Sequence, residues 1–393
     1  MSIVQKRILI AVLSVVAVLL IAGIAALIIL LPAKGEVSNE FWLSTDTYRL
    51  EDTQVIQKEQ GKDFKILNLA DIQYSDVKDI GKRSYTEETI KTLIEQEKPD
   101  LILMTGDQTW TATQRSSIKS LIKFMDSFKI PWAPVFGNHD GEGNADKNWL
   151  ADRYEESEYC LFKKGPNNIG GVGNYIINIM EGDKIVESII MMDSGVWRNY
   201  PDESEHFMYS DALKDDYEGE EASKNYKEYK LNDDGTRQQA QYGTGYEFIA
   251  ESQIAWYKWA IEGAAKINGG TAPESTAVFH IALPEYHEAY LQWLDSGFDP
   301  DMGFGEMREQ VCCPLINSGL FDVMKELGST KNVLVGHDHV NTFSVMYEGI
   351  RLTYGLKTGD RCYVDSDLNG GTVLTLTDKG ITNVEHKFVE VKG

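Results

Sequence analysis

The feature that most constrains the fold is a repeated unit in which a short apolar segment ends in polar residues. Three such units occur at 64–73, 101–108 and 131–140, and helix-like stretches at 86–97 and 115–128 lie between them. Strands that alternate with helices predict α/β layers. Further strands are expected at 173–179, 185–192, 275–281, 332–336, 342–347 and 349–354, with alternating β structure over 371–389. Further helices are expected at 250–266 and 317–327.

The N-terminal region contains a long apolar segment, residues 8–31, interrupted by one serine and one glycine. As a helix it would span roughly 36 Å, enough to cross a hydrocarbon core about 30 Å thick. The apolar core of a cleaved signal peptide is only about 7–15 residues long, so we favour an uncleaved anchor. Because Lys6 and Arg7 precede the segment, residues 1–7 are predicted to be cytoplasmic and the remainder extracytoplasmic. The chain is therefore expected to be a single-pass membrane protein in contact with the lipid bilayer.

The soluble part divides by composition into a linker and one large domain. Residues 32–62 are polar and mixed, which predicts a juxtamembrane linker, and residues 63–393 form the domain. Within it, residues of about 198–241 are rich in acidic side chains and lack an aliphatic run, which predicts a solvated insertion. The insertion is either a loop that gates the substrate or a surface elaboration. The chain carries a net charge of −23 and no basic cluster, so nucleic-acid binding is not expected.

Polar residues gather where the expected strands end. Histidine imidazoles and carboxylates are common ligands of divalent cations. Residues i and i+2 of a strand point to the same face, so Asp71 and Gln73 are expected to reach one ion, and His337 and His339 a common site. Gly106, Gly137 and Gly336 allow the backbone to turn tightly beside the ions. The candidate ligands are Asp71, Gln73, Asp107, Asn138, His280, His337 and His339, and His139 and Asp140 lie beside them.

At these residues the sequence resembles the calcineurin-like metallophosphoesterase superfamily. That family's pattern is Asp-x-His, Gly-Asp, Gly-Asn-His-Asp/Glu, His and Gly-His-x-His. The segments FKILNLADIQYSD, HIALPEY, INSGLF, GHDHVN and YGLKTG are similar to a subgroup of yeast cell-cycle phosphatase-like and plant purple acid phosphatase 29-like proteins. The likeness spans roughly residues 64–360. It implies two packed mixed β-sheets flanked by helices, a four-layer sandwich, here preceded by one transmembrane helix.

The resemblance also implies a centre of two divalent metal ions, of which Asp107 bridges both. It assigns Asp71, Gln73 and His339 to the first ion and Asn138, His280 and His337 to the second. His139 would act on the substrate as general acid or transition-state stabiliser, and Asp140 would orient its ring. The identity of the two metals is left open among Mn, Fe, Zn, Mg and Ca.

Two positions depart from the family pattern. Gln73 stands where the family has His, and a neutral amide oxygen is a weaker ligand than imidazole. This change predicts a looser first site that prefers Mn²⁺, Mg²⁺ or Ca²⁺ over Zn²⁺, or a single weakly held ion. Trp110 stands where purple acid phosphatases have Tyr, so no tyrosinate–iron colour is expected.

Two functions remain in competition. The first is a metal-dependent phosphoric ester hydrolase in which two metal ions activate a water that attacks a phosphomonoester or phosphodiester outside the cytoplasm. The second is a catalytically weak cell-surface binding protein that retains the scaffold, a reading that Gln73 and the acidic insertion motivate. His139 and Asp140 favour the hydrolase, because a binding protein needs no general acid.

Overall fold

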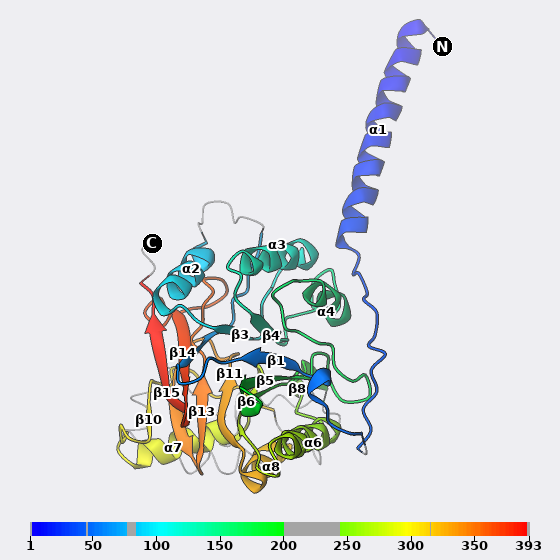
Figure 1. Cartoon of the computed structure of the whole chain (residues 1–393). Coiled ribbons are helices and arrows are strands. Elements are labelled where there is room, and N and C mark those ends of the chain that lie inside the picture. The colour runs from blue at the N-terminus through cyan, green and yellow to red at the C-terminus, as the bar shows by residue number, and fades with distance from the viewer. Residues whose placement is uncertain (1, 45, 77–83, 200–243, 315, 391–393) are drawn as a thin grey trace.

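The computed structural model describes the whole chain except residues 1, 45, 77–83, 200–243, 315 and 391–393. Helix α1 (Ile3–Leu30) projects away from the rest of the molecule (Figure 1). Over Gln5–Ile24 it is long and apolar enough to cross a membrane, and none of that window is buried against the protein. This helix covers nearly all of the expected anchor. The expected acidic insertion lies almost entirely outside the described residues.

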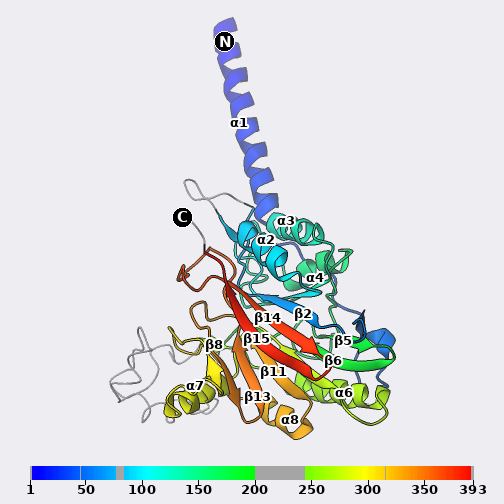
Figure 2. The same ribbon diagram turned by 60° about the vertical axis from the view of Figure 1, so that its left-hand side comes forward.

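Two mixed sheets form the centre of the domain, as expected. The eight-stranded sheet has the order β1-β5-β6-β9-β11-β13-β12-β10, and the five-stranded sheet has the order β15-β14-β2-β3-β4. Figure 2 shows β14 between β15 and β2. The larger sheet consists of β1 (Gln54–Gln57), β5 (Tyr175–Glu181), β6 (Lys184–Met191), β9 (Glu274–Val278), β10 (Gly303–Phe304), β11 (Thr330–Val335), β12 (Ser344–Tyr347) and β13 (Ile350–Tyr354). The smaller consists of β2 (Phe64–Leu69), β3 (Leu101–Thr105), β4 (Trp132–Val135), β14 (Gly370–Thr377) and β15 (Gly380–Phe388).

The helices cover the two outer faces of the paired sheets (Figure 1). Successive residues of a buried strand enter different cores, because strand side chains alternate between faces. In β9, Ala277 faces the core that contains α6, α7 and α8, whereas Val278 faces the core between the sheets, which α2, α3 and α4 also join. The helices are α2 (Thr86–Glu97), α3 (Gln114–Asp126), α4 (Lys147–Glu155), α6 (Glu251–Ile267), α7 (Glu285–Asp295) and α8 (Leu320–Leu327).

Residues 32–62, expected as a juxtamembrane linker, contact the domain at several points. Ala33 forms a β-bridge with Ala145, and Tyr48 is buried, where its hydroxyl oxygen accepts a hydrogen bond from Asn178. Strand β1 adds a parallel edge strand to β5. This strand is only four residues long, and both of its apolar residues stand between glutamines, so its local pattern is too short to indicate a strand. Pairing with β5 supplies the hydrogen bonds that stabilise it.

A buried carboxyl group in β6 is expected to make stability depend on pH. Glu187 is 1% exposed, accepts one hydrogen bond from Thr276 Oγ1 at 2.7 Å, and has no hydrogen-bond partner at Oε2. Burial, with a smaller contribution from the charge of Glu274, raises the pKa of Glu187 to about 8 from an ordinary value of 4.5. Between these values the folded protein retains a proton that the unfolded chain releases. The free energy of unfolding therefore falls as pH rises through this range.

Replacing Glu187 by Gln removes this titration. The difference in free energy of unfolding between the variant and the wild type should shift by about 2–4 kcal/mol in favour of the variant as pH rises from 5 to 8. Urea unfolding of the full chain at both pH values measures the gain. A difference between the two proteins that does not change with pH would contradict the prediction.

Candidate metal centre

The candidate ligands follow the carboxyl ends of strands from both sheets. Asp71, Asp107, His280 and His337 each lie two residues beyond the end of a strand, namely β2, β3, β9 and β11. Asn138 follows β4 in the same way, three residues beyond its end. Strands β2, β3 and β4 run parallel to one another, as do β9 and β11, so each sheet presents its ligands at one edge. Packing the two sheets together brings these edges to a common centre.

The ligand loops have an unusual backbone conformation, which corrects the expectation of strand alternation. Asp71, Gln73, Asp107 and His337 have positive φ angles of 48°, 46°, 51° and 77°. Non-glycine residues seldom adopt this conformation, which costs on the order of 1–3 kcal/mol per residue. The side chains therefore converge through left-handed loop residues and not through the pleat of a strand. Gly137 provides necessary space, because a Cβ there would lie 2.1 Å from Asp107 Oδ1.

Three potential ligand atoms surround Nε2 of His280. Its Nε2 lies 3.1 Å from Asn138 Oδ1, 3.2 Å from His337 Nδ1 and 3.5 Å from Asp107 Oδ1. Ligand atoms that share a cation at about 2.1 Å stand roughly 3.0–3.5 Å apart. His280 Nδ1 lies 2.8 Å from Thr105 O and donates to it, which leaves Nε2 to face the group. These residues thus fit one divalent cation.

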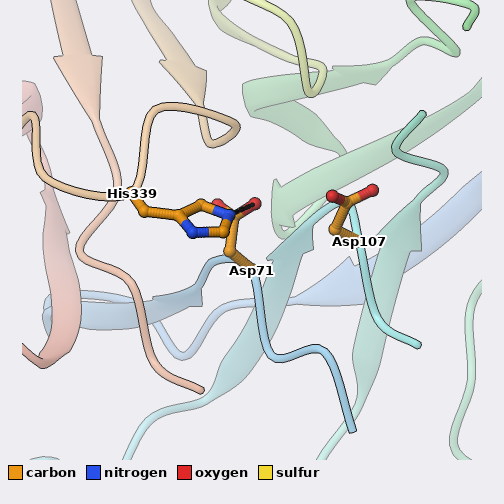
Figure 3. Close-up of side chains that lie close together, drawn as sticks. All are labelled: Asp71, Asp107 and His339. Carbon is orange, nitrogen blue, oxygen red and sulfur yellow. Dashed lines mark ion pairs between the residues drawn. The ribbon is translucent and has the colours of Figure 1, made fainter. Parts of the chain in front are cut away.

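The second group of ligand atoms contains two carboxylates and one imidazole. Atoms of Asp71, Asp107 and His339 all lie within 4.8 Å of one another, and all three residues are buried (Figure 3). Asp71 Oδ1 lies 3.4 Å from His339 Nε2 and has no hydrogen-bond partner. A buried carboxylate oxygen without a hydrogen bond is costly, and a cation would compensate for it. Asp107 belongs to both groups of potential ligand atoms.

Burial and neighbouring charges shift the pKa values of side chains in the centre. Burial would raise the pKa of Asp71, but its close pairing with His339 at 3.4 Å, together with the charges of His280 and Lys357, outweighs burial and lowers the pKa. Burial would lower the pKa of His280, but the charges of Asp107 and Asp71 raise it above its ordinary value. Burial and the charge of His280 lower the pKa of His337. In the metal-free protein, a proton on His280 balances the charge of the neighbouring carboxylates, and a bound cation would replace that proton.

Gln73 does not direct its oxygen into the centre, contrary to expectation. Its Oε1 accepts a hydrogen bond from Lys357 Nζ at 3.0 Å, and its Nε2 lies 3.2 Å from His339 Nε2. The side chain is fully buried, so it lies at the expected place but in a different orientation. Lys357 was not anticipated as a site residue, although its segment YGLKTG contributed to the resemblance.

The carboxylate that holds the His139 ring is Glu142, not Asp140 as expected. Glu142 Oε2 lies 2.6 Å from His139 Nδ1. Asp140 instead accepts hydrogen bonds from the backbone amides of Gly137, Gln108 and Thr109 and so shapes the loop. Burial and the charge of Asp107 raise the pKa of Asp140 to about 7. Glu142 takes the role expected of Asp140 because the Asp140 side chain is buried, whereas Glu142 lies on the solvent side, beside the partly exposed imidazole of His139.

Exposed aromatic rings border the centre. Trp110 is 44% exposed, and its ring centroid lies 5.1 Å from that of His139. Trp197 stacks on Tyr246 at the base of the acidic insertion, and the Tyr246 ring meets His337 edge-on at 4.5 Å. Tyr363 stacks on His339 at 4.2 Å. These rings form apolar walls near the ligand groups. Only Trp110 was singled out in the sequence, as the residue that stands in place of a tyrosine.

Comparison with known proteins agrees with the motifs. Residues 64–256 match the family model described as calcineurin-like phosphoesterase. The chain is 27% identical over 334 residues to probable inactive purple acid phosphatase 29 of Arabidopsis thaliana, covering 77% of this chain and 73% of that protein. It is 25% identical over 331 residues to probable inactive purple acid phosphatase 28 of the same plant, covering 76% and 71%.

Phosphatase DCR2 of Saccharomyces cerevisiae is 28% identical over 327 residues, which cover 77% of this chain and 47% of the yeast protein. The expected plant and yeast subgroup is thereby confirmed. Among solved structures, a dimetal phosphatase from Danio rerio aligns with 82% of this chain and 98% of its own, at 10% identity and a TM-score of 0.46.

Proposed function

Since the chain belongs, through residues 64–256, to the calcineurin-like phosphoesterase family, we propose that it is a metal-dependent phosphoric ester hydrolase. The observation that most supports this proposal is the group around His280, where three potential ligand atoms from separate loops lie 3.1–3.5 Å from one imidazole nitrogen. Asp71 and His339 would contribute to a second cation position that shares Asp107. Bound divalent cations would supply Lewis-acid charge, which neutralises phosphoryl oxygens and makes a water more acidic.

His139 is proposed to exchange the proton of the leaving group. Its backbone N–H donates to Asp107 Oδ1 at 2.9 Å, which fixes the residue next to the ligand group. Glu142 accepts from the ring at Nδ1, which leaves Nε2 available for a proton that passes to the leaving oxygen. The exposed rings of Trp110 and Trp197 would exclude water from part of the substrate site.

The membrane placement is also a proposal. The apolar helix α1 would anchor the protein in the lipid bilayer, and Lys6 and Arg7 would hold its N-terminus on the cytoplasmic side. The domain would then act on phosphoesters outside the cytoplasm. Its strongly negative charge gives it little tendency to bind anionic surfaces.

A binding protein without turnover is the alternative. Two observations favour it: the engagement of Gln73 by Lys357, and the word inactive in the names of two plant relatives. Such a protein would retain one cation and the scaffold while binding its ligand without hydrolysis.

Hydrolysis of a chromogenic phosphomonoester and of a matching diester separates these functions. The full chain in detergent is treated with a chelator and then supplied separately with Mn²⁺, Mg²⁺, Ca²⁺, Zn²⁺ or Fe²⁺. The proposal expects turnover that the chelator abolishes and at least one cation restores. If folded protein shows no turnover with any of these cations, the binding function is favoured.

Glu142→Gln tests the proposed support of His139. The variant retains the size of the side chain but loses the charge that orients the imidazole, so turnover should fall about tenfold or more while metal content is unchanged. Steady-state rates and metal analysis measure the two quantities. Glu156→Gln is the matched control, because Glu156 is an exposed residue that pairs with Arg153 within α4 and its cap. An unchanged rate in Glu142→Gln would contradict the proposed role.

A further inference from the structure

A buried lysine contacts the loop that carries the first candidate ligands. Lys357 is 2% exposed, and its Nζ donates to Asp71 O and to Gln73 Oε1, each at 3.0 Å. The lysine follows β13, whereas both acceptors follow β2. The backbones of Ala70 and Lys357 also form a β-bridge. Lys357 is therefore held against this loop by main-chain and side-chain contacts together.

The lysine determines which way the Gln73 amide points. An ammonium group donates hydrogen bonds and accepts none, so the atom that faces Nζ is the amide oxygen. The NH₂ group consequently lies on the other side, 3.2 Å from His339 Nε2. His339 Nδ1 lies 3.0 Å from Tyr363 O and donates to it, so Nε2 carries the lone pair that accepts from Gln73. The Gln73 oxygen and the His339 lone pair are both engaged by other protein groups.

The position around His280 is different. Three atoms face His280 Nε2 there at distances that fit a shared cation, namely Asn138 Oδ1, His337 Nδ1 and Asp107 Oδ1. A cation beside Asp71 and His339 would in addition lie near the ammonium group of Lys357, which contacts Asp71 O and Gln73 Oε1. Like charges repel most strongly in a buried environment of low dielectric constant. Both the ligand geometry and the charge therefore distinguish the two positions.

We propose that Lys357 makes the two metal positions unequal. The position formed by Asp107, Asn138, His280 and His337 binds a divalent cation tightly. The position beside Asp71 and His339 binds a second cation weakly, because Lys357 withholds the Gln73 oxygen and repels the ion. The inference rests on the proposed metal centre, but it predicts affinities that do not depend on turnover.

Titration of the full chain in detergent with Mn²⁺ tests this inference. Calorimetry should resolve two binding steps in the wild type, with the second at least about 100-fold weaker. Lys357→Met retains a side chain of similar length without a charge or donor, so the second step should strengthen at least tenfold. Electron paramagnetic resonance should then detect the exchange-coupled Mn²⁺ pair at lower Mn²⁺ concentration. Gln73→Leu should strengthen the second step by less than Lys357→Met does, because it frees the His339 lone pair but leaves the ammonium group of Lys357 in place.

Lys58→Met is the matched control for removal of a buried lysine. Lys58 follows β1 and pairs with Glu181 at 2.8 Å, and its loss should not change Mn²⁺ binding. Two steps of equal strength in the wild type, or loss of the second step in Gln73→Leu, would overturn the inference and leave the metal centre intact. Failure of the folded wild type to bind Mn²⁺ would overturn both. If Lys357→Met does not fold, as judged by circular dichroism, the Mn²⁺ affinities of Gln73→Leu and of the wild type still test the inference.

Discussion

Replacement of Asp107 by Asn is expected to remove bound metal and phosphoesterase turnover together. Asp107 Oδ1 accepts from the backbone of His139 at 2.9 Å and lies 3.5 Å from His280 Nε2, and the residue also belongs to the group with Asp71 and His339. Asparagine can retain the hydrogen bond but not the negative charge that both cation positions share. A bound cation would stabilise the transition state by several kcal/mol, and each 1.36 kcal/mol changes the rate tenfold. The rate should therefore fall about a thousandfold or more.

Metal analysis and initial rates measure this result. Asp126→Asn is a control for removal of a hydrogen-bonded carboxylate, since Asp126 accepts from Trp132 Nε1 and Ser157 Oγ away from the centre. The charge of Asp107 raises the pKa of neighbouring Asp140, so its removal relieves repulsion between the two carboxyl groups. The metal-free variant should accordingly be no less stable than the metal-free wild type. An Asp107→Asn protein with normal metal content and rate would refute the bridging role.

His139→Ala is expected to reduce turnover while metal remains bound. The contact of His139 with Asp107 is made by its backbone N–H, which alanine retains, so the ligand group should stay intact. Loss of the imidazole removes the group that exchanges a proton with the leaving oxygen. General acid catalysis contributes about 10²–10⁴-fold, which sets the size of the expected loss.

His337→Ala provides the contrast, because His337 Nδ1 faces His280 Nε2 at 3.2 Å within the cation position. That variant should lose metal as well as rate. The two variants are compared by metal content, kcat and KM under identical cation concentrations. Loss of metal in His139→Ala to the same degree as in His337→Ala would make His139 a ligand and exclude its assigned role in proton transfer.

Local patterns predicted most of the elements that surround the centre. Helix α2 has the bounds that its periodicity indicated, and the buried strands β2, β3, β9 and β11 ended close to the expected positions. Continuous apolar runs are typical of parallel strands buried on both faces, so these elements carry strong signals. Strand β1 was missed because its stability comes from β5, more than a hundred residues away, and not from its own sequence.

Packing roles were also decided by distant contacts. Tyr286 and Asn341 stand beside metal motifs in the sequence. Tyr286 is buried and donates to Val333 O at 3.0 Å, and Asn341 Oδ1 accepts from the backbone of Arg308 and Glu309. Their positions in the sequence placed them near the centre, but only the surrounding elements show that they support its framework.

The sequence by itself determined which chemical groups stand at the ends of the strands, because hydrophobic periodicity and the following glycines and polar residues are local properties. Only the tertiary structure decided which atoms those groups present. Gln73 is turned by Lys357, which is 284 residues away, and His139 pairs with Glu142 because Asp140 is occupied by backbone amides. Side-chain orientation in a buried site follows from hydrogen bonds across the fold, and no local pattern records those partners.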